Sequence, residues 1–117
     1  MARNDCPVCR TAELVCSKWT LLVIRDLGEG ASRFCELERS LDGISPRTLS
    51  LRLRELEREG IVRRETFPEV PPRVEYALTE KGRALLPLIV DMRTYGERWL
   101  CPEQEPESQE TLISHPT

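Results

Sequence analysis

Histidine, aromatic residues and long apolar runs are all scarce in this chain of 117 residues. The one histidine, His115, lies close to the C-terminus, so a Ser–His or Cys–His catalytic pair would lack its base in the folded part. No segment approaches the ~18 apolar residues of a membrane-spanning helix, and the N-terminus lacks the apolar core of a signal peptide. Glycine-rich phosphate loops are also missing. These absences argue against an enzyme and a membrane protein, and the cytoplasm is the expected location.

The net charge of −3 is unusual for a nucleic-acid-binding protein until it is located along the chain. Residues 103–117 contain four glutamates and no Lys or Arg, which leaves residues 1–102 with a net charge of +1. Within them, residues 47–64 contain six arginines against three glutamates. The distribution of charge, more than its sum, steers a protein toward DNA. We expect one folded domain over residues 1–102 and an acidic, disordered tail over residues 103–117.

Capping residues, glycines and prolines divide the chain into short elements. Cys6 and Ser45 each precede a proline, which is favoured at the first position of a helix. Gly60 ends the helix that Ser45 begins, and an Arg-rich, β-prone hairpin follows it. Pro87 should bend the last helix. The predicted helices cover residues 7–15, 18–28, 32–40, 46–59 and 79–100, and the predicted strands cover residues 61–67 and 73–78. The expected fold is mainly α with a small β wing (α+β), a winged helix-turn-helix.

The helix over residues 46–59 has the pattern of a helix that reads a DNA groove. Leu49, Leu53 and Leu56 share one face, which can be buried. The opposite face carries hydrogen-bond donors near the helix N-terminus, where a groove-reading helix needs them. Arginine can form a bidentate pair with guanine, Ser and Thr can bond a base or a phosphate, and leucine can touch a thymine methyl group. The candidate DNA-contacting residues of this helix are Ser45, Arg47, Thr48, Ser50, Leu51 and Arg54.

The hairpin that follows has the composition of a DNA-binding wing. Arg63, Arg64 and Arg73 suit contacts to phosphates or to the minor groove, which position a protein on DNA but read little sequence. Three prolines stiffen the loop between the strands. A plainer interpretation is a solvated helix whose arginines pair with glutamates of the same helix, such as Arg54 with Glu57. A winged helix that contacts only proteins is a third interpretation, and the clustered outward arginines argue against it.

Cys6 and Cys9 form a CxxC motif at the start of the first helix. The helix dipole and the free N–H groups there favour the thiolate, which raises its reactivity. These two cysteines are the candidate redox-sensing residues, through a bond between them or to a partner subunit. A structural cap is one alternative; a zinc site is another, but the motif supplies only two ligands, so no metal or cofactor is expected. A thiol oxidoreductase would carry CxxC beside a strand in a βαβ unit, which is not visible here. Cys35, in the helix over residues 32–40, is expected to be buried.

The order and spacing of these segments closely resemble the HxlR-type winged-helix transcriptional regulators of the MarR-like superfamily, over about residues 6–99. The matching segments are residues 18–22, 33–34, 43–46, 49–50, 52–53, 55–56, 60–62, 68–76 and 78–82. The resemblance implies a homodimeric repressor or activator that binds a near-palindromic site in double-stranded DNA, with N- and C-terminal dimerisation helices. It also singles out Cys6, because some members sense oxidants or electrophiles through a cysteine before this proline. Cys9 is not part of the family pattern.

The last predicted helix carries more apolar surface than one small chain can cover, so a second copy is expected to bury the remainder. The alternative is that the first helix of the same chain covers it. The candidate dimer-interface residues are Leu85, Leu88, Ile89, Met92, Tyr95 and Trp99. The predicted function is a sequence-specific DNA-binding regulator that acts as a homodimer and senses an oxidant or electrophile through Cys6. The alternative is a ligand-responsive or constitutive repressor of the same fold with structural cysteines.

Overall fold

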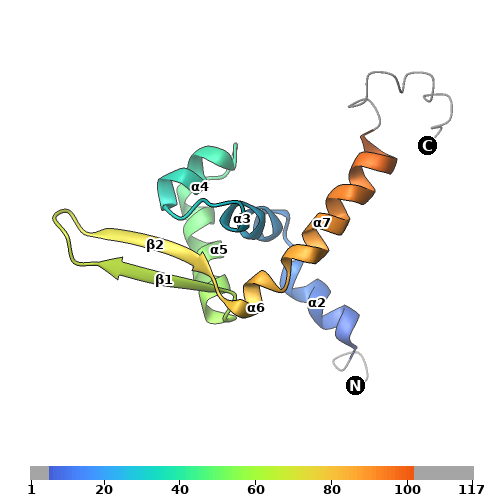
Figure 1. The fold of residues 1–117 in the computed structure, drawn as a ribbon, viewed down its shortest axis with the longest axis horizontal. Helices are drawn as coiled ribbons and strands as arrows, with labels where there is room; N and C mark the ends of the chain where they lie inside the picture. Colours follow the sequence, from blue (N-terminus) through green and yellow to red (C-terminus); the bar gives the residue numbers. More distant parts are fainter. Residues whose placement is uncertain (1–5, 102–117) are drawn as a thin grey trace. The chain divides into compact units, whose positions relative to one another are not determined.

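A computed structural model describes residues 6–101, so the tail predicted for residues 103–117 lies outside the described part of the chain. The elements are α2 (Pro7–Val15), α3 (Lys18–Gly28), α4 (Phe34–Ser40), α5 (Pro46–Arg58), β1 (Val62–Phe67), β2 (Arg73–Leu78), α6 (Glu80–Arg83), α7 (Leu86–Tyr95) and the π-helix η1 (Gly96–Leu100), labelled in part in Figure 1. The chain divides into two compact units: the first ends at Leu86 and the second begins at Pro87. None of the helices within residues 6–101 is both long and apolar enough to cross a membrane.

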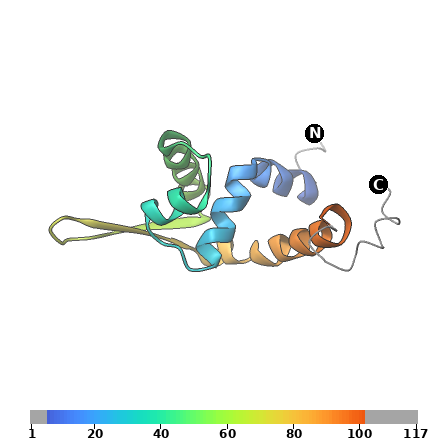
Figure 2. The ribbon, with the colours of Figure 1, turned by 90° about the horizontal axis from the view of Figure 1, so that it is seen from above.

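The hydrophobic core of the first unit lies where α3, α4 and α5 pack against one another and against the base of the β1–β2 hairpin (Figures 1 and 2). The apolar spacing of each helix places one face inward, while the opposite face stays in solvent. The buried apolar side chains are Val23, Ile24, Leu27, Leu37, Leu41, Ile44, Leu49, Leu53, Leu56, Ile61, Val62 and Leu78. Both strands contribute only at their ends nearest the helices, so the rest of the hairpin projects away from this core (Figure 2).

The hairpin is the predicted wing. β1 and β2 pair antiparallel from Val62 opposite Leu78 to Phe67 opposite Arg73. Residues 68–72 connect them and contain three prolines, whose nitrogens cannot donate a hydrogen bond to a further strand. The winged helix-turn-helix predicted from the sequence is therefore confirmed, and the predicted boundaries of both strands agree with the structure to within one residue.

A short junction after β2 closes the wing onto the end of α5. The Thr79 N–H donates to the Ile61 carbonyl at 3.0 Å, and the Thr79 hydroxyl donates to the Gly60 carbonyl at 2.6 Å. The same hydroxyl accepts from the N–H of Gly82 at 3.1 Å and so caps α6. Gly60 adopts φ +78°, which a residue with a side chain rarely does, and this lets the chain leave α5 and enter β1. The junction fixes both ends of the hairpin base to α5.

The single helix predicted over residues 79–100 is wrong, because the structure breaks it into α6, α7 and η1. Pro87 explains the first break. Its nitrogen has no hydrogen to donate to the carbonyl of Arg83, and its ring would collide with that carbonyl in a continuous helix. α6 accordingly ends at Arg83, and α7 starts one residue before the proline. The expected bend at Pro87 is thus a full interruption.

Replacing Gly82 with alanine is predicted to destabilise the first unit. Gly82 is buried, and a Cβ atom there would meet the backbone carbonyl oxygen of Ile61, which cannot move without disturbing the junction. We expect Gly82→Ala to lower the free energy of unfolding by about 1–3 kcal/mol, measured by urea denaturation. Gly96→Ala is the control, since nothing lies within 4 Å of the added methyl group, and it should change stability by less than ~0.5 kcal/mol. Equal effects of the two substitutions would contradict the steric explanation.

Candidate nucleic-acid interface

The start of α5 is fixed by its own sequence. Ser45 is the N-cap residue, and its hydroxyl oxygen accepts from the N–H of Thr48 at 3.1 Å. The two hydroxyl groups, of Ser45 and Thr48, also lie 3.0 Å apart in a hydrogen bond. Pro46 occupies the first turn, where a missing N–H has no cost. Two of the predicted DNA-contacting residues therefore also hold the first turn of the helix in place.

The two faces of α5 differ sharply in exposure. Leu49, Leu53 and Leu56 are buried, as the sequence predicts. On the opposite face Arg47 and Arg54 are exposed and Leu51 is 44% exposed, while Thr48 and Ser50 are half-buried beside them. Burial of the leucines holds the helix by one side and leaves the donor-bearing side in solvent. The structure thus gathers the predicted residues of α5 on one accessible surface.

Arg47 and Arg54, on the outer face of α5, form no ion pairs with carboxylates within residues 6–101. Within residues 6–101, the ion pair along α5 joins Arg52 and Glu55 at 3.0 Å, and Arg52 is half-buried. No hydrogen bond or ion pair in the described part of the chain engages the guanidinium of Arg47 or Arg54. The plainer interpretation, in which Arg54 pairs with Glu57, is not what the structure shows. These guanidinium groups remain available to an external anion.

The wing brings a further arginine toward α5. Arg63 and Arg64 are neighbours on β1, so their side chains leave opposite faces of the hairpin. A solvent-open hollow of about 370 Å³ between α5 and the wing is lined by Ser50, Leu53, Arg54, Glu57, Arg64 and Tyr76. Two arginines from elements that are distant in sequence thus face one concave surface. Tyr76 was not among the predicted site residues, although its place on β2 opposite Arg64 follows from the strand register.

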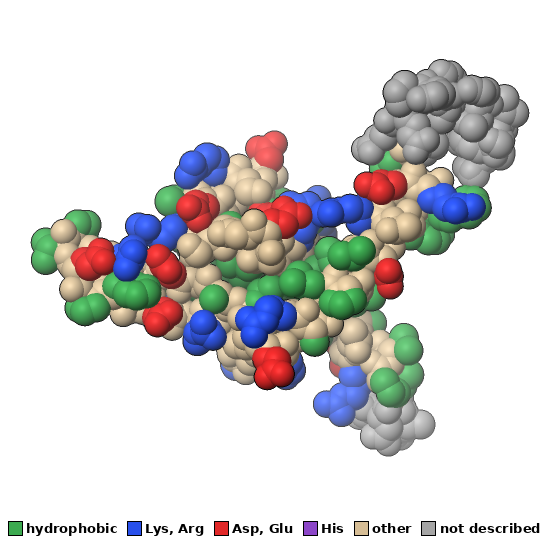
Figure 3. All heavy atoms as spheres, viewed as in Figure 1, with side chains coloured by type: hydrophobic (Ala, Val, Ile, Leu, Met, Phe, Trp, Pro, Cys, Tyr) green, Lys and Arg blue, Asp and Glu red, His purple; other side chains and the backbone are tan. Residues whose placement is uncertain are grey.

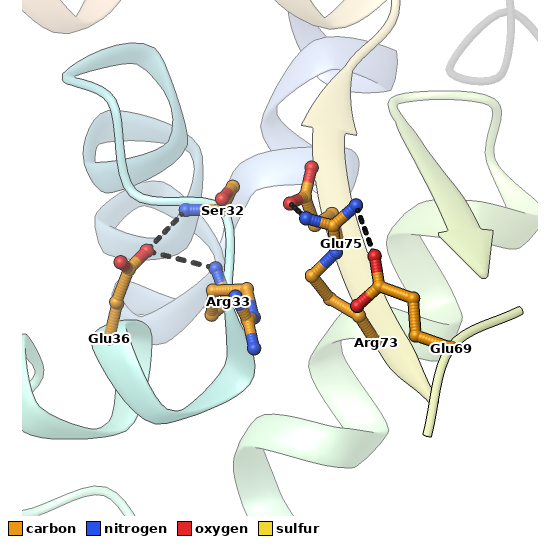
Figure 4. Close-up of polar contacts among 6 residues, drawn as sticks. All are labelled: Ser32, Arg33, Glu36, Glu69, Arg73 and Glu75. Carbon is orange, nitrogen blue, oxygen red and sulfur yellow. Dashed lines mark hydrogen bonds and ion pairs between the residues drawn. The ribbon is translucent and has the colours of Figure 1, made fainter. Parts of the chain in front are cut away.

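Arg73 differs from the other two wing arginines, because carboxylates of the wing itself engage it. Its Nη2 atom lies 3.1 Å from Glu69 and its Nη1 atom 3.4 Å from Glu75 (Figure 4). The guanidinium carbon also lies 4.1 Å from the centre of the Phe67 ring, as in a cation–π contact. The sequence pattern predicts that Arg73 contacts DNA and gives no indication of the Glu69 and Phe67 contacts. The spacing of Arg73 and Glu75, which puts both on one face of β2, was the available signal.

The wing is also tied to the helices at its middle. The N–H of Tyr76 donates to the carbonyl of Ser32 at 2.7 Å, which joins β2 to the segment before α4. That segment is held by Glu36, whose carboxylate accepts from the N–H groups of Ser32 at 2.8 Å and of Arg33 at 3.0 Å (Figure 4). The bond from the Ser32 N–H, followed by that from Arg33, lowers the pKa of Glu36, so the carboxylate stays ionised. The sequence pattern predicts none of these anchoring contacts.

The CxxC motif lies at the N-terminus of α2, as predicted. The sulfur of Cys6 accepts from the N–H of Cys9 at 3.4 Å. This bond is the largest cause of a lowered pKa at Cys6, and the hydrogen bond with the Cys9 side chain lowers it further. The pKa of Cys9 is raised, mainly by its hydrogen bond with Cys6. The two thiols are therefore unequal: near neutral pH a larger fraction of Cys6 than of Cys9 is thiolate.

The expectation that Cys35 is buried is wrong, because its side chain is exposed. Cys35 is the second residue of α4, and Leu37, two positions later, is the buried one. Residues two positions apart in an α-helix point about 200° apart around its axis. A helix that buries Leu37 therefore turns Cys35 to solvent. Cys16 is likewise exposed, whereas Cys6, Cys9 and Cys101 are half-buried.

The predicted dimer-interface residues belong to the segment after β2. Because the predicted helix is interrupted, Leu85 precedes α7 and Trp99 lies in η1, while the other four are on α7. No side chain of α7 is buried, and Met92, Tyr95 and Trp99 are 47%, 59% and 59% exposed. Leu85 and Ile89 are half-buried. Exposed apolar side chains that lie together on one segment are typical of a surface that contacts another molecule.

Several known proteins are similar to this chain in sequence and in fold. An uncharacterised HTH-type transcriptional regulator of Synechocystis sp. is 46% identical over 100 residues, covering 86% of this chain and 73% of the relative. The solved structure of the reduced form of the transcriptional regulator YodB from Bacillus subtilis is 38% identical, with a TM-score of 0.71, and covers 83% of this chain and 96% of YodB. The redox regulator HypR in its oxidised form is 44% identical, with a TM-score of 0.75, covering 80% and 96% of the two chains.

The sequence profile of the HxlR-like helix-turn-helix family matches residues 14–104, which is most of the chain and includes α3, the winged helix-turn-helix and α7. The resemblance inferred from the sequence is confirmed by this match and by the identities of the relatives. This chain belongs to the HxlR-like helix-turn-helix family of transcriptional regulators.

Proposed function

We propose that this protein is a cytoplasmic, homodimeric regulator that recognises a near-palindromic site in double-stranded DNA through α5 and the wing. The observation that carries the proposal is the two-sided character of α5. Three buried leucines hold the helix on one side, and Arg47 and Arg54 on the other side have no intramolecular partner within residues 6–101. Arg47, Thr48, Ser50, Leu51 and Arg54 read base edges or adjacent phosphates in the major groove.

The hollow between α5 and the wing suggests how the protein is positioned on the duplex. With α5 in the major groove, the flanking sugar–phosphate strand passes between the helix and the hairpin, at the surface that Arg54 and Arg64 share. Arg63 leaves the other face of the hairpin and meets the next phosphates or the minor groove. These contacts add affinity and orientation, whereas the contacts of α5 add the sequence preference.

Dimerisation accounts for the uncovered apolar residues of the C-terminal segment. Leu88, Met92, Tyr95 and Trp99 are each more than a third exposed, and a second copy buries them across a two-fold axis. α2 supplies further apolar surface, because Val8 is exposed and no residue of α2 is buried. Two copies of α5 then read half-sites about one helical turn apart, ~34 Å, or a multiple of it.

The chemistry of Cys6 supports an oxidant or electrophile as the signal. The hydrogen bonds from Cys9 lower the pKa of Cys6, so a larger fraction of it is thiolate near neutral pH. Relatives are consistent with such a role: HypR is described as a redox regulator, and YodB has been solved in reduced and diamide-treated forms. Oxidation joins Cys6 to Cys9 or to a cysteine of the partner subunit. The alternative is a ligand-responsive or constitutive repressor whose cysteines serve only as caps.

Arg54→Ala is predicted to weaken specific DNA binding by ~1–3 kcal/mol, because it removes a donor from the centre of the reading face. Fluorescence anisotropy would compare a duplex selected from a random pool on the wild-type protein with a scrambled duplex. Arg10→Ala, which removes the same charge from α2, is the control and should change both affinities little. If Arg54→Ala and Arg10→Ala behave alike, α5 does not read DNA as proposed.

Met92→Glu is predicted to convert the dimer to monomers, because it buries a charge in the proposed interface. Sedimentation velocity at micromolar concentration would measure the change. Thr94→Glu provides the matched control, since Thr94 is also exposed but lies about 160° around α7 from Met92, away from the apolar stripe. The proposed interface would be refuted by a Met92→Glu protein that remains as dimeric as the Thr94→Glu protein.

Cys6→Ser is predicted to keep DNA binding but to lose its response to diamide, because the reactive thiolate is absent. Anisotropy before and after diamide would report the response, and Cys35→Ser, which removes an exposed thiol elsewhere, should leave it intact. Non-reducing electrophoresis separates the two products, since only a bond to the partner gives a covalent dimer. A Cys6→Ser protein that still responds like the wild type would refute sensing through Cys6, whereas a wild-type protein that does not respond to diamide would favour the alternative with structural cysteines.

A further inference from the structure

The tip of the wing has an unfavourable composition for an element that approaches DNA. Glu69 lies in the connecting loop and Glu75 on β2, both close to the end of the hairpin. The Glu69 side chain is half exposed, so its carboxylate would face the phosphates of a bound duplex. Like charges brought together across an interface oppose association. Something in the wing must offset these two carboxylates if the tip is to reach DNA.

Arg73 lies where it can offset the negative charges of both Glu69 and Glu75. Its Nη2 and Nη1 atoms lie 3.1 Å and 3.4 Å from the carboxylates of Glu69 and Glu75, so one guanidinium bridges the two (Figure 4). Phe67 stands opposite Arg73 as the last pair of the ladder before the loop, and the guanidinium lies 4.1 Å from its ring centre. The contacts therefore link β1, the loop and β2 at the loop end of the hairpin.

Because of these contacts, the guanidinium of Arg73 has few free hydrogen-bond donors with which to bind a phosphate group. Both terminal nitrogens face carboxylates, the plane covers an aromatic ring, and the Nε atom is buried without a partner. Arg63 and Arg64, by contrast, are exposed and have no ion pair within residues 6–101. The three wing arginines therefore differ in their availability to DNA, although the sequence alone predicts one basic group.

We propose that Arg73 is a positioning residue for DNA binding, which neutralises Glu69 and Glu75 and holds the wing tip in shape without contacting a phosphate itself. The inference rests on the proposed DNA-binding function. The tip that Arg73 supports is uncharged apart from Glu69: residues 68–72 are otherwise prolines and the fully exposed Val70, and Figure 3 shows hydrophobic side chains there. A tip of this kind fits against the sugars that wall the minor groove, once the carboxylates behind it are neutralised.

The test is a charge-suppression series measured by anisotropy on the selected duplex at several salt concentrations. Arg73→Met removes the charge but keeps a long apolar side chain that can still pack on Phe67. We expect it to weaken binding by roughly tenfold, because two carboxylates then face the phosphates. Adding Glu69→Gln and Glu75→Gln to Arg73→Met should restore the affinity to within about threefold of wild type, since the two carboxylates that Arg73 engages are then uncharged, while the exposed Glu65 opposite Glu75 is the same in every variant. Arg73→Lys keeps the charge but cannot bridge both carboxylates with one planar group. Its affinity should lie between that of Arg73→Met and that of the triple variant.

The salt dependence separates neutralisation from direct contact. Loss of a phosphate contact lowers the slope of log affinity against log salt by about 0.9. We expect the triple variant to keep the wild-type slope. A slope lower by about 0.9 in the triple variant, or wild-type affinity in Arg73→Met alone, would overturn the inference. Thermal melting of each variant verifies that the comparison is between folded proteins.

Arg54→Ala, measured alongside, separates failure of this inference from failure of the proposed function. If Arg54→Ala weakens binding but the triple variant is not restored, only the role of Arg73 is wrong. If the wild-type protein binds no duplex even at low salt, the proposed DNA-binding function fails, and the inference fails with it.

Discussion

Burial of Leu49, Leu53 and Leu56 is the constraint on which the rest of the structure depends. Each leucine contributes about 1.5–3 kcal/mol by leaving water, and together they fix the rotation of α5 about its own axis. Once that rotation is fixed, Arg47 and Arg54 must point outward, whereas Arg52 is half-buried and pairs with Glu55. The same interaction that stabilises the first unit therefore decides which side chains can meet DNA, and no separate device is needed to display them.

The wing can contact DNA beside α5 only if its direction relative to α5 is equally well fixed. Hydrogen bonds to backbone carbonyls fix that direction. At its base, Thr79 is bonded to the carbonyls that follow α5; at its middle, Tyr76 is bonded to Ser32. The second bond depends on Glu36, which holds the loop that carries Ser32. Arg54 and Arg64 consequently face one hollow, held there by contacts within the protein. Such preorganisation reduces the ordering cost that binding would otherwise incur.

Local signals made much of this predictable from the sequence. A serine before a proline, leucines at helical spacing and Gly60 after the last turn set the limits of α5, because each acts within a few residues. The missed features depend on distant partners. The bond between Tyr76 and Ser32 and the ion pair between Arg73 and Glu69 require the path of a loop, which no periodicity encodes. Cys35 was misjudged because its exposure depends on which side of a two-turn helix Leu37 occupies.

The attachment of both α5 and the wing to the core also limits which parts of the protein a regulatory signal can move. With α5 and the wing each fixed to the core, a signal that leaves the core intact cannot easily redirect one against the other. In the proposed dimer, it can change the separation of the two α5 helices, which must match the pitch of the duplex. α2 and α7 are the elements for this role, since neither has a buried side chain. Cys6, the thiol whose pKa is lowered, starts α2 and so lies in the part of the chain best placed to transmit a chemical change.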